Sequence, residues 1–288
     1  MSIFQAQRSA RADHLAQRAA FGCIWLAAAV TIIILALIIG VIFWRGLPRL
    51  SWEFLTGSPQ DMGRGGGIFP TIVGTVVVGA LALLIAAPLG VGTAVYLTEY
   101  TAESRLTRAI RFGTESLAGV PSIIFGLFGF IFFVTYLHMG WSVLAGGLTL
   151  ALMVLPTIIR VAEEAIRTVP QGYRDVSFSL GATRWQMVTT AVLPSALPGI
   201  VTGIILAFGR AVSETAVVIF TAGTALNLPS SPLAPVRTMA VHFYILAVEG
   251  ISLPNAYATG AVLIITILLI NASANAALHW LARRRARR

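Results

Sequence analysis

The chain has 288 residues, of which 57% are apolar and 11% are charged, whereas soluble domains average about 45–50% and about 25%. That composition excludes a soluble domain and a disordered chain. A disulfide-rich secreted scaffold is excluded as well, because the single cysteine, Cys23, has no internal partner. The net charge of +9 comes from 20 arginines without any lysine, and they flank apolar segments instead of forming the basic face of a nucleic-acid-binding protein. The sequence therefore predicts an all-α integral membrane protein.

Six apolar stretches are long enough to cross a bilayer, which takes about 20 residues of helix. They are Phe21–Trp44, Phe69–Leu97, Leu117–Leu137, Trp141–Arg160, Leu193–Thr221 and Asn255–Leu281. The first exceeds the apolar part of a signal peptide, which has about 7–15 residues, and no small-residue cleavage pattern follows it. We expect six transmembrane helices, the first of them peripheral, with the third and fourth forming a tight hairpin.

The arginines indicate the orientation, because the cytoplasmic loops of membrane proteins are enriched in basic residues. With the N-terminus inside, 15 of the 20 arginines fall on the inner side and four on the outer side, while Arg210 lies within the fifth span. Both termini are thus predicted to be cytoplasmic. The predicted segments are an inner tail at 1–20, the first span at 21–44, an outer loop at 45–68, a membrane core at 69–281 and a basic inner tail at 282–288.

Two features stand out in the outer segments. The glycine-rich run Gly63–Gly67 predicts a flexible hinge before the second span. The apolar patch Met239–Val248 predicts a short re-entrant or interfacial helix. Within the membrane core, Pro121 is expected to bend or break the third span.

The long inner loop at 161–192 is the most informative stretch of the chain. Tyr173–Leu180 has the pattern of a short helix, Gly181 permits a sharp turn, and Thr183–Val192 is a second amphipathic stretch. A helix–glycine–helix of this kind is suited to a groove on another protein. The alternative is a helix that rests on the lipid interface.

The amino-acid sequence of this loop resembles the EAA loop of bacterial ATP-binding-cassette importer permeases. Asp175-Val176-Ser177 stands where that family has Glu-Ala-Ala, and the following positions match it: Gly181, Ala182, Arg184, Trp185, Leu193 and Pro194. The resemblance implies a type I importer permease fold and a coupling helix held in a cleft of a cytoplasmic ATPase. The residues expected to couple to the ATPase are Tyr173, Arg174, Asp175, Val176, Ser177, Phe178, Leu180, Gly181 and Ala182.

The ATPase itself must be a separate chain. Its phosphate-binding loop needs a lysine to reach the nucleotide phosphates, and this chain has none. We therefore expect a transport subunit that is not an enzyme and that binds neither a cofactor nor a metal ion.

The fifth span carries two formal charges, Arg210 and Glu214. An ionised group in hydrocarbon costs roughly 2.5–3.5 kcal/mol, so such residues face a cavity or a partner. A spacing of four predicts that both lie on one helical face within reach of each other. They could brace the bundle as a pair or line the transport route, with Ser213 and Thr215 as polar neighbours in contact with substrate.

Gly209-Arg210, Glu214-Thr215 and the opening of the second span at Gly65–Thr75 resemble the phosphate-specific permeases of PstA type. The resemblance implies a bacterial inner-membrane heterodimer with a PstC-type permease, two PstB-type ATPase subunits and an external PstS-type phosphate-binding protein. Import of sulfate, molybdate or an amino acid by the same architecture is the alternative. An intramembrane enzyme is disfavoured, because the only ionisable residues expected to be buried in the spans are one arginine and one glutamate, without a nucleophile and base, an aspartate pair or a metal cluster.

Overall fold

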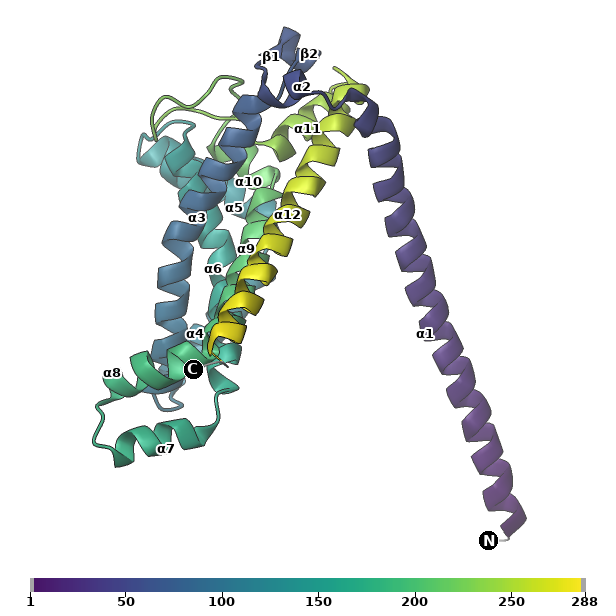
Figure 1. Ribbon diagram of the computed structural model, residues 1–288, viewed down its shortest axis with the longest axis vertical. Coiled ribbons are helices and arrows are strands. Elements are labelled where there is room, and N and C mark those ends of the chain that lie inside the picture. The colour runs from purple at the N-terminus through teal and green to yellow at the C-terminus, as the bar shows by residue number, and fades with distance from the viewer. Residues whose placement is uncertain (1–2, 286–288) are drawn as a thin grey trace.

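The computed structural model describes the backbone of residues 3–285 and the side chains of residues 17, 18 and 20–276. The predicted basic tail at 282–288 therefore has no described side chains. The chain is a helical bundle with a short hairpin and a small helix at one end and a helical hairpin at the other (Figure 1). Within these described residues, five helices are long and apolar enough to cross a membrane, and a bent helix pair makes a sixth candidate span. The predicted all-α membrane class is confirmed.

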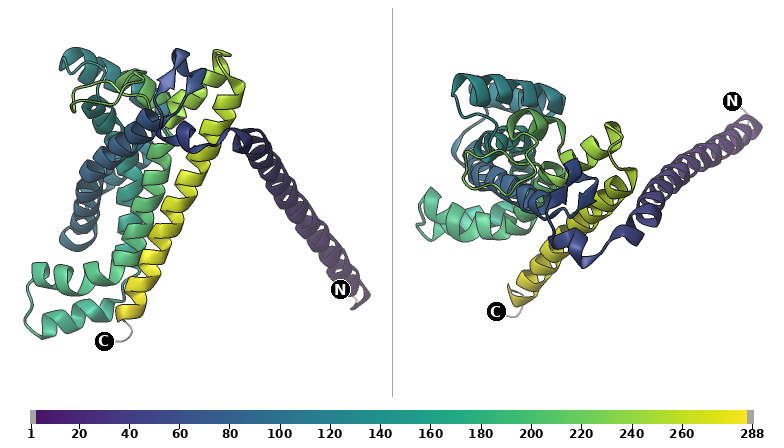
Figure 2. Two further views of the ribbon diagram at one scale, coloured as in Figure 1. Left: turned by 45° about the horizontal axis from the view of Figure 1, so that its top comes forward. Right: turned by 90° about the horizontal axis from the view of Figure 1, so that it is seen from above.

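Helix α1 (Ile3–Gly46) stands apart from the rest of the molecule. It meets α12 (Leu253–Arg285) near its C-terminal end and then diverges from it, as two views show (Figures 1 and 2). At the junction, Gly46 lies so close to α12 that an added Cβ would sit 2.5 Å from the carbonyl oxygen of Tyr257. The apolar part of α1 is otherwise uncovered by the described residues.

The outer segment after α1 is ordered. A 3-10 turn η1 (Leu47–Arg49) and α2 (Trp52–Thr56) lead into strand β1 (Pro59–Gln60), the turn η2 (Asp61–Gly63) and strand β2 (Gly65–Gly66). The strands pair antiparallel, so the expectation of a flexible hinge was wrong. Gly66 has φ +72° and packs against the backbone of Ser58, which explains why glycine is needed there.

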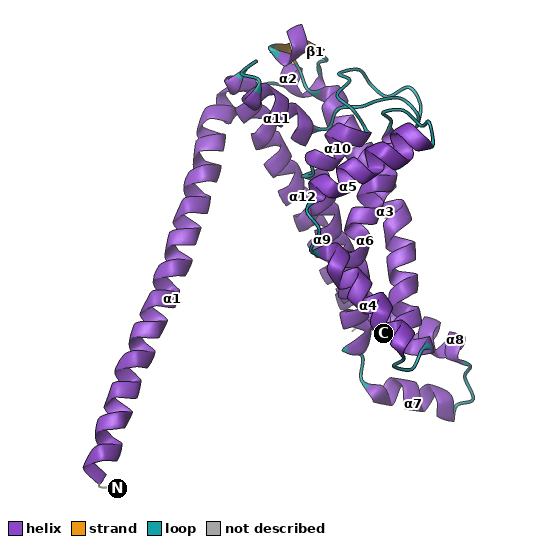
Figure 3. Cartoon of the chain, turned by 180° about the vertical axis from the view of Figure 1, so that it is seen from behind, coloured by secondary structure: helices purple, strands orange, loops and turns teal. Residues whose placement is uncertain are grey.

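The core is built from α3 (Phe69–Val95), α6 (Val143–Arg167) and α9 (Leu193–Val212), with α12 beside them (Figure 3). Small residues let these helices approach closely, as is common in membranes. A Cβ at Gly90 would lie 2.7 Å from Ile158, and one at Gly203 would lie 2.6 Å from Val161. Helix α6, which corresponds to the fourth predicted span, ends at Arg167 and not at Arg160.

The third predicted span is broken. Helix α4 (Arg105–Ala118) meets α5 (Ser122–Gly129) and the π-helical η4 (Phe130–Tyr136) at an angle of 100°. Pro121 stands at the break and has an extended ψ of 137°. The apolar span therefore starts at Ser122 and not at Leu117, and α4 packs along α6 as an amphipathic helix.

The inner loop folds into helices α7 (Gln171–Ser179) and α8 (Arg184–Met187), at the end of the molecule opposite the β-hairpin (Figure 1). Helix α8 continues through the π-helical η5 (Val188–Val192) into α9. Beyond α9 the chain breaks and resumes as α10 (Ala216–Thr221). The predicted outer helix is present as α11 (Met239–Val248), buried on one side by its neighbours.

Candidate functional site

The α7–α8 hairpin has the predicted local structure, and its local chemistry explains why. Gly181 has φ +80°, the left-handed conformation that closes a helix without a Cβ penalty. Thr183 then caps α8: its hydroxyl accepts from the Gln186 amide, and the Gln186 side chain accepts from the Thr183 amide. The hairpin is thus a defined unit, referred to below as the coupling hairpin (residues 171–187).

The coupling hairpin exposes apolar side chains that no described residue covers. Leu180 is 82% exposed and Trp185 is 66% exposed. Tyr173, Val176 and Phe178 are also exposed. Uncovered apolar side chains gathered at one end of a molecule indicate an interaction surface. Asp175 is exposed as well, so these predicted coupling residues are accessible to a partner.

Arg174 differs from the other predicted coupling residues, because it points inward. Its Nη2 lies 2.6 Å from Oε1 of Glu99, and its Nε donates to both Glu99 carboxylate oxygens at 3.1 Å. It also donates to the carbonyl oxygens of Val169 at 2.8 Å and Ile166 at 3.2 Å. Arg174 therefore holds α7 to the π-helical end of α3, η3 (Tyr96–Tyr100), through contacts within this chain.

Glu99 is a residue that the sequence did not single out. The other arm of the coupling hairpin reaches the same place, since Arg184 donates to the carbonyl oxygens of Glu99 at 3.3 Å and Tyr100 at 3.5 Å. The sequence indicates this role of Glu99 only weakly, because it shows a single glutamate at the inner end of an apolar span, 75 residues from its partner.

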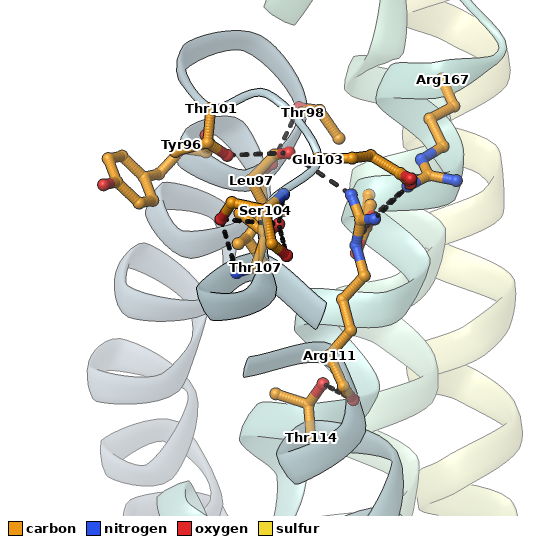
Figure 4. A network of polar contacts seen from close by, with 12 residues as sticks. Tyr96, Leu97, Thr98, Thr101, Glu103, Ser104, Thr107, Arg111, Thr114 and Arg167 are labelled. Atoms are coloured by element: carbon orange, nitrogen blue, oxygen red, sulfur yellow. Dashed lines mark hydrogen bonds and ion pairs between the residues drawn. The ribbon is translucent and has the colours of Figure 1, made fainter. Parts of the chain in front are cut away.

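A second charged network lies beside this contact. Arg111 of α4 has its Nε 2.9 Å from Glu163 and its Nη1 3.2 Å from Glu103, and Arg167 also pairs with Glu163 at 2.7 Å. Figure 4 shows Arg111 reaching from α4 toward Glu103 and toward the helix that carries Arg167. Cavities of about 400 Å³ and about 580 Å³ lie on either side, and Arg111 and Arg167 line both.

Helix α9 has one buried face and one uncovered face. The buried face packs small residues into the bundle: Ala196, Ile200, Gly203, Ala207 and Ala211. The uncovered face carries residues that recur with helical spacing: Ser195, Pro198, Thr202, Leu206 and Arg210. The guanidinium of Arg210 makes no hydrogen bond or ion pair with any residue in the part of the chain that the structure describes.

The prediction that Arg210 and Glu214 lie on one face of a continuous helix was wrong. Helix α9 ends at Val212, so the two residues no longer share a helix. Glu214 instead accepts hydrogen bonds through Oε1 from the amides of Ala216 at 3.1 Å and Val217 at 3.5 Å. A carboxylate at that position satisfies the first amides of α10 and complements its dipole. The Glu214 side chain thus holds the first two amides of α10, and the Arg210 guanidinium is left without a partner among the described residues.

The two polar neighbours lie in the break itself. The Ser213 hydroxyl donates to the carbonyl oxygens of Gly209 at 3.0 Å and Arg210 at 3.1 Å. Thr215 precedes α10, and its carbonyl oxygen accepts from the Ile219 amide at 3.0 Å. A serine hydroxyl that bonds to a carbonyl one turn earlier is common in helices and locally weakens them. Ser213 is exposed, and Thr215 and Glu214 are half-buried.

A buried polar cluster holds the outer end together. Arg237 donates to the Thr224 carbonyl oxygen at 2.8 Å, and its Nη1 lies 3.4 Å from Nδ1 of His242. Burial, and then the positive charge of Arg237, lower the pKa of His242 from 6.5 to about 4. The Thr75 hydroxyl accepts from the Met239 amide at 2.8 Å, which ties α3 to α11.

Comparison with known proteins adds to this geometry. The family described as "Binding-protein-dependent transport system inner membrane component" matches residues 86–287. The probable ABC transporter permease protein YqgI of Bacillus subtilis is 36% identical over 284 residues, 93% of this chain and 95% of that protein. The phosphate transport system permease protein PstA 2 of Mycobacterium bovis is 33% identical over 266 residues, 91% of this chain and 87% of that protein.

A solved structure of the MetNI methionine ABC transporter in an inward-facing conformation matches with a TM-score of 0.59. The alignment covers 74% of this chain and 93% of that chain at 23% identity. This likeness shows that the chain has a type I ABC importer permease fold.

Proposed function

This chain belongs to the family of binding-protein-dependent transport system inner membrane components, and we propose that the solute it conducts is inorganic phosphate. As a member of that family it is a multi-pass permease component of an ABC importer in the cytoplasmic membrane. The choice of phosphate draws on the PstA-type relatives and on the chemistry of α9.

The observation that carries the proposal is the unpaired Arg210 on the uncovered face of α9. It stands 17 residues beyond Leu193, roughly 25 Å along the helix, in the last turn of α9 and ahead of α10. A guanidinium at that depth is unfavourable against lipid. The uncovered face of α9 therefore lines an aqueous route or a second subunit, and Thr202, Arg210 and Ser213 would line the solute path.

An arginine at this position is suited to an oxyanion, because its planar fork gives two parallel hydrogen bonds to two oxygen atoms. Glu214 adds a means of selection. Its Oε1 is occupied by the amides of α10, and its Oε2 would accept a hydrogen bond from a protonated oxyanion. Hydrogen phosphate has such a proton at neutral pH and sulfate does not, so Glu214 would favour phosphate. Ser213 and Thr215 would supply further polar contacts.

The coupling hairpin is the site proposed for a cytoplasmic ATPase. Its exposed side chains form the contact: Tyr173, Asp175, Val176, Phe178 and Leu180, with Ser177, Gly181 and Ala182 shaping the turn. Two PstB-type ATPase subunits would bind this surface and its counterpart on a PstC-type permease, while a PstS-type protein delivers phosphate at the outer end. Closure of the ATPase pair would then move the helices and expose the route to each side in turn.

The proposal is tested with the complete complex reconstituted in liposomes. We expect ATP-dependent uptake of labelled phosphate that excess unlabelled sulfate, molybdate or methionine does not reduce. Uptake of one of these competitors in place of phosphate would overturn the phosphate assignment and favour the alternative solute, while leaving the family membership intact.

A further inference from the structure

We infer that Glu99 is a positioning residue that fixes the coupling hairpin to α3, so that movement of the hairpin is passed to α3 as well as to α6 and α9. The inference rests on the proposed docking of an ATPase at the coupling hairpin. It adds a role for Glu99, Arg174 and Arg184 that the docking surface alone does not need.

The chain connections leave α3 out. Helix α7 follows α6 after Thr168–Pro170, and α8 runs through η5 directly into α9. A force on the coupling hairpin therefore reaches α6 and α9 through the backbone. It reaches α3 indirectly, through the packing of α3 against α6 and α9, and directly through polar contacts of Glu99 and Tyr100 with Arg174 and Arg184.

Both arms of the coupling hairpin converge on the same end of α3. In the first arm, Arg174 donates hydrogen bonds from Nε and Nη2 to the Glu99 carboxylate. It also donates to the Ile166 carbonyl oxygen in the last turn of α6. From the second arm, Arg184 donates to the Glu99 and Tyr100 carbonyl oxygens. These carbonyls lie at the C-terminal end of a helix, where a positive charge is favoured. The hairpin and the end of α3 thus form one unit.

Burial makes this contact hard to break during movement. The side chain of Glu99 is 5% exposed and that of Arg174 is 12% exposed, whereas Glu103, in the neighbouring network, is 78% exposed. Separating a buried pair leaves an uncompensated charge, which is strongly unfavourable. A moving hairpin therefore carries the end of α3 with it.

Helix α3 continues the connection to the outer end. Near its start, Thr75 accepts a hydrogen bond from the Met239 amide of α11, and Gly74 lies against the Arg237 backbone. The contact at Glu99 thus connects the proposed ATPase-binding end of the molecule to α11 at the outer end, and α3 is the helix that makes the connection.

The test uses the whole complex with Glu99→Gln, Glu99→Asp and the matched control Glu103→Gln. We expect Glu99→Gln to retain the ATPase subunit in normal amount, while phosphate imported per ATP hydrolysed falls roughly 10-fold or more, as the loss of charge-assisted hydrogen bonds predicts. Glu99→Asp should recover part of that ratio, and Glu103→Gln should leave it unchanged. A wild-type ratio in Glu99→Gln, or loss of the ATPase subunit from it, would overturn the inference.

Two further measurements keep the inference testable. If Glu99→Gln does not fold, Arg174→Lys serves instead, because it retains the charge but loses the two parallel donors of the guanidinium. It should lower the amount of phosphate imported per ATP hydrolysed while the ATPase subunit stays bound. An unchanged ratio overturns the inference. Stimulation of ATP hydrolysis by the external binding protein reports coupling whatever the solute. We expect Glu99→Gln to lose that stimulation even if the wild-type complex imports no phosphate, a result that would count only against the proposed function.

Discussion

Arg174 and Glu99 meet across 75 residues of sequence, with Nη2 of the arginine 2.6 Å from Oε1 of the glutamate. Both side chains are largely buried at the inner end of the bundle. The arginine in the first helix of the coupling hairpin is thus part of the permease's own structure, while its neighbours Val176 and Leu180 are exposed. This division of roles leads to the first prediction.

Arg174→Ala should destabilise the protein far more than Arg167→Ala. Removal of Arg174 leaves the Glu99 carboxylate buried without its partner, which costs about 3–5 kcal/mol. Arg167 is exposed and pairs with Glu163, so its loss should cost less than about 1 kcal/mol. Thermal unfolding in detergent measures the difference, and equal shifts of the two midpoints would contradict the internal role of Arg174.

Leu180→Asp should abolish copurification of the ATPase subunit. A carboxylate at the most exposed apolar position of the coupling hairpin would have to be desolvated on docking, which costs several kcal/mol. The matched control is Leu233→Asp, the same change at an exposed leucine of the outer loop, which should leave the complex intact. Retention of the ATPase subunit by Leu180→Asp would show that the coupling hairpin is not the docking site.

Gly181→Ala should weaken ATPase binding through the backbone alone. The left-handed conformation at Gly181 disfavours a Cβ by about 1–2 kcal/mol, although the space around it is open. Gly172 has equally open space and an ordinary helical conformation, so Gly172→Ala should be harmless. Affinity for the isolated ATPase subunit should fall roughly 5- to 30-fold for the first change only. Similar affinities for both variants would argue against the role of the turn.

The outer end of the molecule should lose stability in acid. His242 is neutral when folded, with its pKa lowered to about 4 by burial and by Arg237, while the unfolded chain binds the proton near pH 6.5. Stability should therefore be full above pH 6.5, fall progressively toward pH 4 and reach a loss of about 3 kcal/mol. His242→Asn should remove this dependence, as measured by denaturant unfolding across that range; an unchanged pH profile in the variant would assign the titration elsewhere.

The sequence was sufficient where local chemistry decides the structure. Gly181 between two amphipathic stretches predicted the coupling hairpin, because a left-handed turn and the Thr183 cap are local features. The apolar patch at Met239–Val248 likewise predicted α11.

The sequence was insufficient where side chains distant in the chain, or in competition with the backbone, decide the structure. Spacing by four predicted an Arg210–Glu214 pair, but α9 ends at Val212, and the Ser213 and Glu214 side chains bond to backbone groups. The pairing of Glu99 with Arg174 depends on how α3 and α7 pack, and no periodicity reports that. The glycines near Gly66 indicated flexibility, whereas close backbone approach is what requires them.

The most direct test of the account is phosphate uptake by the complete complex carrying Arg210→Gln, beside the matched control Arg108→Gln at an exposed arginine of α4. Loss of a forked, charge-assisted contact predicts uptake reduced roughly 10- to 100-fold at limiting phosphate, with normal assembly. The control should transport at the wild-type rate. Wild-type uptake by Arg210→Gln would contradict the claim that the uncovered face of α9 binds the passing anion.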